Sequence, residues 1–315
     1  MHGGAVTLAG RVNACKMIPD IFLVSDMLDL NVFRSLLLPE LRKIPVFIYF
    51  HENQFAYPDV SSSPDHHYRY INYLAALGAD KIFFNSRYNR DSFLEGVQNL
   101  LQGFPDYRNM QTIHAIKKKS EILELGFSCN EYQQTKKENK VAHILWNHRW
   151  EHDKGPEEFF QALIQIKNRG IRFKLVVCGE VYKTSPQIFQ TARKELTEEI
   201  VHFGFVKSRQ EYLQLLAVAD IIPVTSKQDF FGISVVEAVL SGAIPLLPKR
   251  LAYPEIFPVK KYNSCYYENL AEELEKKITD FSYPETDILR QDLIAHLQKY
   301  DWSRLKNKYN EKILS

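Results

Sequence analysis

The stretch Ala219–Pro248, ADIIPVTSKQDFFGISVVEAVLSGAIPLLP, decides the fold of this 315-residue chain. Its first apolar run, Ile221–Val224, leads into a polar turn and then into an apolar helical pattern, and a second apolar run, Ile244–Leu247, follows that helix. A strand, a helix and a second strand in this order predict a right-handed βαβ unit, whose two strands lie parallel in one sheet.

The same alternation runs along the rest of the chain. Apolar runs that are continuous rather than alternating predict strands buried on both faces, as parallel sheets contain. The predicted strands are Ile21–Ser25, Val46–Phe50, Lys81–Phe84, Val141–Trp146, Phe173–Cys178, Val201–Phe203, Ile221–Val224 and Ile244–Leu247. The predicted helices are one that begins at Ser63-Pro64 and carries Ile71, Leu74, Ala75 and Gly78 on one face, one that begins at Gly155-Pro156 and carries Phe159, Phe160, Leu163 and Ile164, and one over Trp302–Leu314.

The polar stretch Asn130–Lys140 has no apolar period and predicts a connection between two domains. We expect a first domain over residues 1–130, a linker over residues 131–140 and a second domain over residues 141–315. Two parallel α/β domains that face each other form a cleft at the carboxyl ends of their strands, where ligands bind in such folds.

Composition excludes several classes of protein. Hydrophobic residues make up 45% of the chain and charged residues 25%, which excludes bulk disorder. The net charge of +2 is too even to indicate nucleic-acid binding by itself. No apolar run is long enough for a transmembrane helix, and Met1–Lys16 lacks the apolar core of a signal peptide. We expect a cytoplasmic protein with no membrane partner and with reduced thiols. The four cysteines are Cys15, Cys129, Cys178 and Cys265.

The turn inside the opening stretch carries a candidate anion site. Gly232 allows close approach of the backbone, and the N–H groups of Gly232, Ile233 and Ser234 at the start of the helix can bind a phosphate. About one helical turn further, the carboxylate of Glu237 can accept hydrogen bonds from a ribose diol, and Asp229 can meet sugar hydroxyls. A plain strand–turn–helix with a capping Asp229 and a solvated Glu237 is the alternative, which we prefer for one acid alone but not for the whole arrangement.

A second polar cluster, WNHRWEHDKGP at Trp146–Pro156, also follows a predicted strand and precedes a helix. Arg149 and Lys154 in this loop place two cations beside a helix N-terminus, which suits a diphosphate and requires no metal ion. The alternative is a solvated loop with local Arg–Glu and Lys–Asp pairs. The spacing of His148 and His152 occurs in metal sites, but the Gly-Pro break disfavours a helical pair of ligands.

Four polar residues, His51, Glu52, Asn53 and Gln54, follow the predicted strand Val46–Phe50. Polar side chains at the carboxyl end of a parallel strand favour substrate contacts, and we expect Glu52, Asn53 and Gln54 on the acceptor side of the site. For His51 alone, a hydrogen-bonded interior histidine is an equal alternative.

Motifs of several other enzyme classes are absent from the sequence. It has no G-x-G-x-x-G fingerprint, no G-x-x-x-x-G-K-[ST] phosphate loop, no G-x-S-x-G elbow and no D-x-D pair to hold a divalent ion on a diphosphate. Some lysines can touch phosphates, although we prefer a solvated loop and linker for them. They are Lys117–Lys119, Lys136, Lys137 and Lys140.

These motifs together resemble a known group of enzymes. The segment DFFGISVVE at 229–237 resembles the acid-x7-acid signature of the retaining glycosyltransferase family 4, and the R-x4-KG pattern at Arg149–Gly155 resembles the diphosphate clamp of that family. The segment ADKIFFNSRYNRDSF at 79–93 resembles its strand-to-serine turn. Within the family, the chain resembles the tRNA-queuosine mannosyltransferases from about His2 to about Pro258. The segments that carry this closer resemblance are HENQFAYP at 51–58, ILWNHRWEHDKGPEEFF at 144–160, SKQDFFGISVVEAV at 226–239 and LAYPEIFP at 251–258.

The resemblance implies a GT-B fold, in which two Rossmann-like parallel-sheet domains face a cleft and the second domain binds the nucleotide sugar. It implies transfer of mannose, with retention, from GDP-mannose to a hydroxyl on the cyclopentene ring of queuosine in a tRNA anticodon. By this resemblance Arg149 and Lys154 would bind the donor diphosphate and Glu237 the ribose. The catalytic residues would be Asp229, on the donor sugar, and His51, which matches the family histidine at the cleft. We expect no cofactor besides the donor, and no metal ion.

Two departures from the family pattern bear on these expectations. The first acid of the signature is usually Glu, and Asp229 is one methylene shorter. Such a first domain also normally opens with a strand and a Gly-rich turn, whereas the first clear strand here is Ile21–Ser25. We therefore expect an incomplete N-terminal domain and a start at an internal methionine of a longer reading frame, with poor solubility and little transfer by the chain as it stands.

Two other functions remain open from the residues. One is a family 4 glycosyltransferase that acts on a lipid, a glycan or a small molecule, although no exposed amphipathic basic helix favours a lipid. The other is a truncated, non-catalytic chain that binds a nucleotide or a partner.

Overall fold

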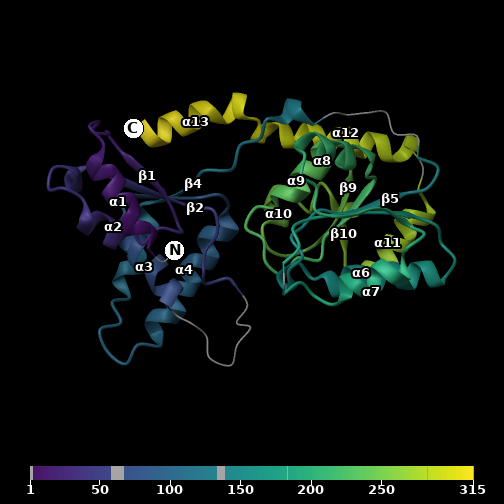
Figure 1. Ribbon diagram of the computed structural model, residues 1–315, viewed down its shortest axis with the longest axis horizontal. Helices are drawn as coiled ribbons and strands as arrows, with labels where there is room; N and C mark the ends of the chain where they lie inside the picture. Colours follow the sequence, from purple (N-terminus) through teal and green to yellow (C-terminus); the bar gives the residue numbers. More distant parts are fainter. Residues whose placement is uncertain (1–2, 58–66, 133–138, 183, 282, 315) are drawn as a thin grey trace. The chain divides into compact units, whose positions relative to one another are not determined.

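The computed structural model describes residues 3–57, 67–132, 139–182, 184–281 and 283–314. The chain divides into two compact units, Met1–Leu125 and Gly126–Ser315. Each unit is built on its own parallel sheet, with helices packed against it (Figure 1). Residues 133–138 of the predicted linker and the predicted helix start at Ser63-Pro64 lie outside the described residues.

The first unit contains a sheet in the order β1-β2-β3-β4, in which every neighbouring pair is parallel. Its strands are β1 (Phe22–Ser25), β2 (Val46–Phe50), β3 (Lys81–Phe84) and β4 (Ser120–Ile122). Its helices are α1 (Gly4–Ala14), α2 (Leu30–Leu36), α3 (His67–Gly78), α4 (Arg87–Gln102) and α5 (Gln111–Lys118), with the 3-10 turn η1 (Leu41–Lys43). The strands end at a common edge, where Asp26, His51 and Asn85 follow β1, β2 and β3.

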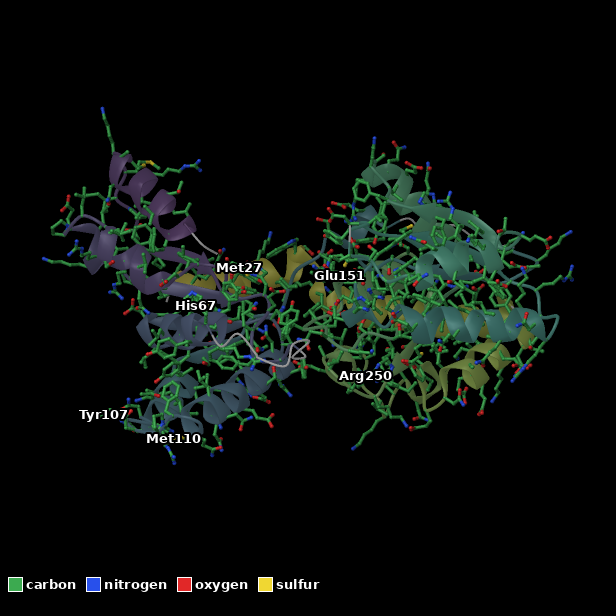
Figure 2. The ribbon with its side chains drawn as sticks, turned by 60° about the horizontal axis from the view of Figure 1, so that its bottom comes forward. Met27, His67, Tyr107, Met110, Glu151 and Arg250 are labelled. Atoms are coloured by element: carbon green, nitrogen blue, oxygen red, sulfur yellow. The ribbon has the colours of Figure 1, made fainter. Side chains whose placement is uncertain are left out.

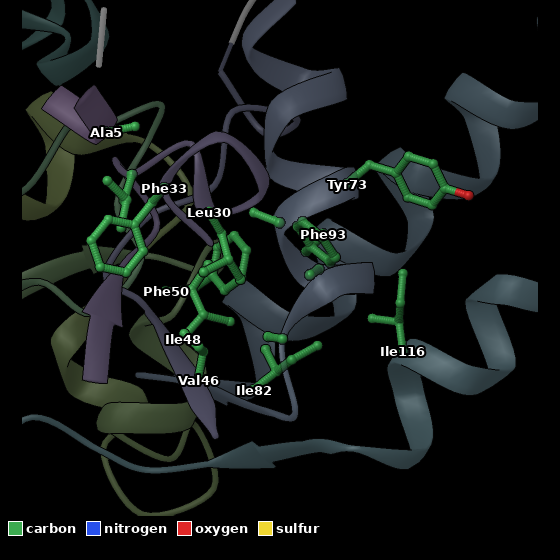
Figure 3. Close-up of a cluster of buried hydrophobic side chains, with 14 of the residues drawn as sticks. Ala5, Leu30, Phe33, Val46, Ile48, Phe50, Tyr73, Ile82, Phe93 and Ile116 are labelled. Atoms are coloured by element: carbon green, nitrogen blue, oxygen red, sulfur yellow. The ribbon is translucent and has the colours of Figure 1, made fainter. Parts of the chain in front are cut away.

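One apolar cluster joins the sheet and helices of the first unit (Figure 3). Alternate residues of β2, Val46, Ile48 and Phe50, are fully buried in it, because successive side chains of a strand point to opposite faces. Phe33 of α2 and Phe93 of α4 complete the same cluster, so this face of the sheet is dry.

The buried face of α3 differs from the one that the sequence predicts. Its fully buried residues are Asn72, Tyr73, Ala75 and Ala76. Ile71 and Leu74 are only half-buried. The helix turns Asn72 inward because the amide of Asn72 accepts a hydrogen bond from the Gln54 N–H (3.0 Å) and donates one to the Asp26 carbonyl (3.0 Å). A buried polar residue changes which face of the helix points to the core, and a prediction from the spacing of apolar residues does not detect this.

The second unit contains a parallel sheet in the order β10-β9-β8-β5-β6-β7. Its strands are β5 (His143–Trp146), β6 (Lys174–Cys178), β7 (Ile200–Gly204), β8 (Ile221–Pro223), β9 (Ile244–Pro248) and β10 (Tyr266–Tyr267). Its helices are α6 (Pro156–Asn168), α7 (Ile188–Glu195), α8 (Arg209–Val218), α9 (Ile233–Leu240), α10 (Tyr253–Ile256), α11 (Leu270–Thr279), α12 (Tyr283–Leu297) and α13 (Trp302–Leu314). Its 3-10 turns are η2 (Cys129–Glu131), η3 (His152–Lys154), η4 (Asn263–Cys265) and η5 (Gln298–Tyr300). In Figure 1, α6, α7 and α11 cover one face of this sheet, and α8, α9 and α12 cover the other.

The strand order of the second unit reverses beside β5. The chain passes from β5 through β6 to β7 and then returns past β5 to form β8, β9 and β10 on the other side. The helices that follow β5 and β8, α6 and α9, therefore lie on opposite faces of the sheet. Such a switch point opens a crevice in which doubly wound α/β domains bind their ligands.

The structure confirms most of the predicted elements. All eight predicted strands are present as β1–β3 and β5–β9, with ends that differ by no more than two residues, and α6 and α13 are present as predicted. All four cysteines are free thiols. The strands β4 and β10 were not predicted, nor were the bounds of the helices α1, α2, α4, α5, α7, α8, α10, α11 and α12. Both strands are very short, and α1 is formed by the Gly- and Ala-rich start of the sequence.

His148 anchors the loop after β5 inside the second unit. Its carbonyl accepts a hydrogen bond from the Trp146 indole (3.0 Å), and its Nδ1 pairs with the Ser234 hydroxyl (2.9 Å). Gly179 packs against it so closely that a Cβ there would lie 2.1 Å from the His148 carbonyl oxygen. Burial, and then the charge of Lys154, lowers the pKa of the His148 imidazole to about 4. The ring is therefore neutral at neutral pH.

Because the folded state keeps His148 neutral, we expect the second unit to lose stability as the pH falls. Below its unfolded pKa of about 6.5 the imidazole takes up a proton in the unfolded chain but not in the folded one until the pH approaches 4. The free energy of unfolding of the second unit should therefore fall by about 2 kcal/mol more between about pH 7.5 and about pH 5 in the wild type than in His148→Asn. Asparagine keeps an atom that can reach Ser234 but does not titrate.

Urea unfolding followed by tryptophan fluorescence measures this difference, because all three tryptophans, Trp146, Trp150 and Trp302, belong to the second unit. His152→Asn is the control, since the side chain of His152 is 70% exposed. An equal loss of stability in the wild type and in His148→Asn would contradict the assignment.

Candidate active site

The β8–α9 turn, residues 224–232, brings together several of the predicted site residues. Gly232 adopts a left-handed conformation (φ 79°) and starts α9, and a Cβ there would lie 3.0 Å from the Tyr253 ring. The Asp229 carboxylate closes the turn, with Oδ1 accepting a hydrogen bond from the Gly232 N–H (2.8 Å). Its Oδ2 accepts a second hydrogen bond from the Tyr253 hydroxyl (3.0 Å).

This geometry corrects one part of the predicted anion site. The N–H of Gly232 is occupied by Asp229 and is not available to a phosphate in this conformation. The N–H groups of Ile233 and Ser234 lie in the first turn of α9, where a helix provides no partner from within. Asp229 therefore closes the turn but does not cap α9, whose N-cap residue Gly232 has no side-chain cap hydrogen bond.

The β5 loop, residues 147–155, packs directly on the β8–α9 turn. Gly155 has a left-handed conformation (φ 67°), and a Cβ there would lie 2.5 Å from the Thr225 carbonyl oxygen. The Thr225 hydroxyl donates a hydrogen bond to the Lys154 carbonyl (2.8 Å). Arg250, marked with Glu151 in Figure 2, donates to the carbonyls of Thr225 and Ser226 (3.1 Å each). The Thr225 hydroxyl, together with the Lys227 N–H that donates to the Asp153 carbonyl (2.7 Å), therefore fixes the two loops to each other.

The two predicted cations already have acidic neighbours. Lys154 belongs to the 3-10 turn η3 rather than to an open loop, and its side chain is only 12% exposed. Its ammonium group lies 3.0 Å from Asp153 and donates to the Gln228 carbonyl (2.6 Å). Arg149 pairs with Glu151 (3.1 Å) and is 47% exposed. The local Arg–Glu and Lys–Asp pairs of the alternative interpretation are present, and Lys154 is the cation that touches the β8–α9 turn.

Glu237 is not a solvated acid. Its side chain is 14% exposed and accepts hydrogen bonds from Arg209 (2.8 Å), Tyr212 (2.9 Å) and Tyr132 (3.1 Å). The Arg209 guanidinium lies over both tyrosine rings, 5.7 Å from the centroid of Tyr132 and 5.4 Å from that of Tyr212. The amide of Asn147 donates to the Tyr212 hydroxyl (3.1 Å) and to the Ser234 carbonyl (2.8 Å), which ties this network to the β5 loop.

Both tyrosines of this network are donors toward the carboxylate. Burial, and then the negative charge of Glu237, raises the pKa of Tyr132 and of Tyr212, so both hydroxyls stay protonated. Three of the roughly four lone-pair positions of the Glu237 carboxylate are used in this conformation. A ribose diol at Glu237 would therefore have to displace or share some of these partners.

Several buried polar atoms at these two loops have no hydrogen-bond partner among the described residues. They are Asn147 Oδ1, His148 Nε2 and both side-chain amide atoms of Gln228. Unsatisfied atoms of this kind cost about 1–3 kcal/mol each, and native proteins contain few of them without a reason. Their concentration beside Asp229 and Lys154 indicates a polar surface that a ligand completes.

In the first unit, His51 lies at the carboxyl end of β2 with an exposed ring. Its side chain is 56% exposed, so the alternative of an interior histidine is wrong. The His51 N–H donates to Asp26 Oδ1 (3.0 Å), and its Nδ1 lies 3.5 Å from the same oxygen. Asp26 is 1% exposed, and the Asn85 amide holds the His51 carbonyl (2.7 Å). A buried carboxylate thus supports an accessible imidazole.

The structure does not support Asn53 as a substrate contact. Asn53 is fully buried, its amide donates to Asn89 Oδ1 (2.8 Å) and to Ser92 (3.1 Å), and its oxygen accepts from two backbone N–H groups of its own loop. It shapes the loop instead. Glu52 and Gln54 are half-buried and therefore remain candidates for the acceptor side.

The network partners were missed in the sequence. Asp26, Tyr132, Arg209, Tyr212 and Tyr253 are distant from the motifs along the chain, and no local pattern distinguishes them from surface or core residues. Two of these residues could have been proposed from the sequence. Asp26 directly follows a predicted strand, and Tyr253 lies in the segment LAYPEIFP.

The remaining predicted groups have ordinary surroundings. Lys119 donates to the carbonyls of Leu77 and Ala79 at the end of α3, and burial lowers its pKa, so it is not a free phosphate ligand. Lys136 and Lys137 lie outside the described residues. The described part of the chain contains no group of three or more metal-binding side chains. None of the helices described is long and apolar enough to cross a membrane.

Two family models match the chain, one in each unit. Residues 1–127 match the family model of the tRNA-queuosine alpha-mannosyltransferase N-terminal region, and residues 130–299 match glycosyl transferases group 1. The chain is 34% identical over 255 residues to the tRNA-queuosine alpha-mannosyltransferase of Drosophila melanogaster, a match that covers 77% of this chain. It spans 66% of the length of the fly protein, slightly less than two thirds. It is also 26% identical over 161 residues to the D-inositol 3-phosphate glycosyltransferase of Corynebacterium aurimucosum, covering 48% of this chain and 37% of that protein.

Solved structures support the fold. Anabaena Alr3699/HepE in complex with UDP and glucose has a TM-score of 0.71 at 15% identity, covering 99% of this chain and 81% of that one. The UDP-forming trehalose-phosphate synthase of Burkholderia xenovorans has a TM-score of 0.72 at 18% identity, covering 99% of this chain and 77% of that one. These similarities, together with the two parallel sheets, confirm the predicted GT-B class. The chain belongs to the glycosyl transferases group 1 family, whose model matches more than half of it, and its N-terminal region is similar to that of the tRNA-queuosine alpha-mannosyltransferases.

Proposed function

We propose that the chain transfers mannose from GDP-mannose to queuosine in tRNA, with retention at the sugar. The observation that carries the proposal is that both acids of the acid-x7-acid stretch, Asp229 and Glu237, are held in hydrogen-bonded positions beside the switch point of the second unit. The name of the fly relative and the N-terminal family match support the acceptor and the sugar.

In this proposal the diphosphate binds beside the N-terminus of α9. Lys154 exchanges its contacts with Asp153 and the Gln228 carbonyl for phosphate oxygens, and the N–H groups of Ile233 and Ser234 contribute the helix dipole. Arg149 adds a second cation from the same loop as Lys154. Charge that grows on the leaving diphosphate is stabilised most, because these donors are already in place.

The two acids then have different tasks. Glu237 accepts hydrogen bonds from the ribose, and its partner Arg209 moves aside or shares the carboxylate. Asp229 holds hydroxyls of the transferred mannose. In the first unit, His51 orients the sugar or the acceptor, and Glu52 and Gln54 lie on the acceptor side. We propose no metal ion and no further cofactor, since cations and a helix N-terminus can neutralise the diphosphate.

The four free thiols suit the reducing cytoplasm, where we place the reaction. The two other functions stay distinguishable by experiment. A lipid, glycan or small-molecule acceptor would leave the donor site unchanged. A non-catalytic chain would bind GDP without turnover.

The test is transfer of labelled mannose from GDP-mannose to tRNA that contains queuosine, with otherwise identical queuosine-free tRNA as the control. We expect label in the first tRNA alone. Equal labelling of both would show that queuosine is not the acceptor. Hydrolysis of the donor without labelling would favour a different acceptor, and tight GDP binding without any turnover would favour the non-catalytic alternative.

We expect removal of Lys154 or Arg149 to lower the affinity for the donor nucleotide. Removal of Lys154 in Lys154→Ala deletes a charge-assisted contact with the diphosphate and should weaken GDP binding by about 1.5–3 kcal/mol, and Arg149→Ala should act in the same direction. Calorimetric titration with GDP measures both. Lys261→Ala is the matched control, because Lys261 is an exposed lysine that pairs with Asp292 in the same unit. Wild-type affinity in both folded variants would refute the diphosphate assignment.

We expect substitution of Glu237 to affect donor binding rather than turnover. A ribose contact stabilises the bound donor and the transition state alike, so Glu237→Gln should raise the KM for GDP-mannose about tenfold and leave kcat nearly unchanged. Glu211→Gln removes an exposed carboxylate from α8 and serves as the control. If Glu237→Gln lowered kcat at saturating donor and left KM unchanged, the ribose assignment would be wrong.

A further inference from the structure

We propose that Tyr253 is a positioning residue that holds Asp229 on the transferred sugar. The inference rests on the proposed function and adds to it a residue outside the acid-x7-acid stretch. It starts from the hydrogen bond between the Tyr253 hydroxyl and Asp229 Oδ2 (3.0 Å). Tyr253 lies in the short helix α10 that follows β9, whereas Asp229 lies in the turn that follows β8.

Tyr253 is itself immobilised. It is fully buried, its ring edge borders the position that a Cβ of Gly232 would occupy (3.0 Å), and its backbone carbonyl accepts a hydrogen bond from the Tyr266 hydroxyl (2.9 Å). Tyr266 also donates to the Phe257 carbonyl, so the segment after β9 is held at both ends of α10. A donor on such a fixed side chain determines where its acceptor lies.

The carboxylate of Asp229 is thereby held at both oxygens. Oδ1 accepts from the Gly232 N–H (2.8 Å) and Oδ2 from Tyr253. Each oxygen of an ionised carboxylate has about two lone-pair positions, so about one on each stays open for a sugar hydroxyl. With both oxygens engaged, the group cannot rotate away from the turn, and its open positions keep a fixed direction.

The role follows from the length of the side chain. The side chain of Asp229 has a single methylene between the backbone and the carboxylate, so it has few torsions with which to find the sugar. Burial, and then the charge of Asp229, raises the pKa of Tyr253, which keeps the hydroxyl protonated. The tyrosine therefore remains a donor throughout the reaction and fixes the short acid before the sugar arrives.

The alternative is that Tyr253 only fills the core below the turn. Tyr253→Phe separates the two, since it removes the hydroxyl and keeps the ring. We expect this variant to bind GDP as the wild type does, to lose its discrimination between GDP-mannose and GDP in calorimetric titrations, and to transfer mannose about tenfold to a hundredfold more slowly. Tyr262→Phe is the matched control, because Tyr262 is another buried tyrosine of the second unit, and its hydroxyl donates to the Asp292 backbone carbonyl (3.4 Å) and not to Asp229.

A double-mutant cycle with Asp229→Asn completes the test. If Tyr253 acts through Asp229, adding Tyr253→Phe to Asp229→Asn should cause no further loss of transfer, whereas two independent losses would multiply. Wild-type transfer by Tyr253→Phe, multiplicative losses in the cycle, or equal effects of Tyr253→Phe and Tyr262→Phe would each overturn the inference. Failure of the wild-type protein itself to transfer mannose would overturn the proposed function instead.

Discussion

The close contact between the β5 loop and the β8–α9 turn is the constraint on which the rest of the candidate site depends. Gly155 makes it possible, since a Cβ would lie 2.5 Å from the Thr225 carbonyl oxygen, and the Thr225 hydroxyl fixes the Lys154 carbonyl from the other side. A side chain at Gly155 would force the two loops apart. Lys154 would then leave the turn that carries Asp229, and the start of α6 would shift with it.

The second consequence of this contact is that the site is organised before any ligand is present. Glu237 and Asp229 accept hydrogen bonds from Arg209, which stacks on Tyr132, and from the buried Tyr253, and Lys154 donates to the Gln228 carbonyl. Binding of a diphosphate and a ribose would therefore exchange one set of charge-assisted contacts for another. Such an exchange avoids exposing unpaired buried charges at any stage, which would be costly.

The fold was predictable from the sequence because most strands of both sheets are continuous apolar runs. Continuous apolar runs located β1–β3 and β5–β9, and the turn residues around Gly232 and Gly155 located the two loops of the site. What could not be predicted depends on side-chain direction and on distant contacts. Asn53 and His51 are near neighbours in one polar stretch, yet one is fully buried and the other is exposed, since the loop turns Asn53 toward Asn89. Arg209 and Tyr132 reach Glu237 from segments that no local pattern connects.

The most direct test of this account is a crystal structure of the protein with GDP. The account predicts the diphosphate at the N-terminus of α9, with the Lys154 ammonium on phosphate oxygens instead of the Gln228 carbonyl and with the ribose hydroxyls on Glu237. GDP bound elsewhere in the second unit, with Lys154 and Glu237 still in their internal pairs, would contradict it.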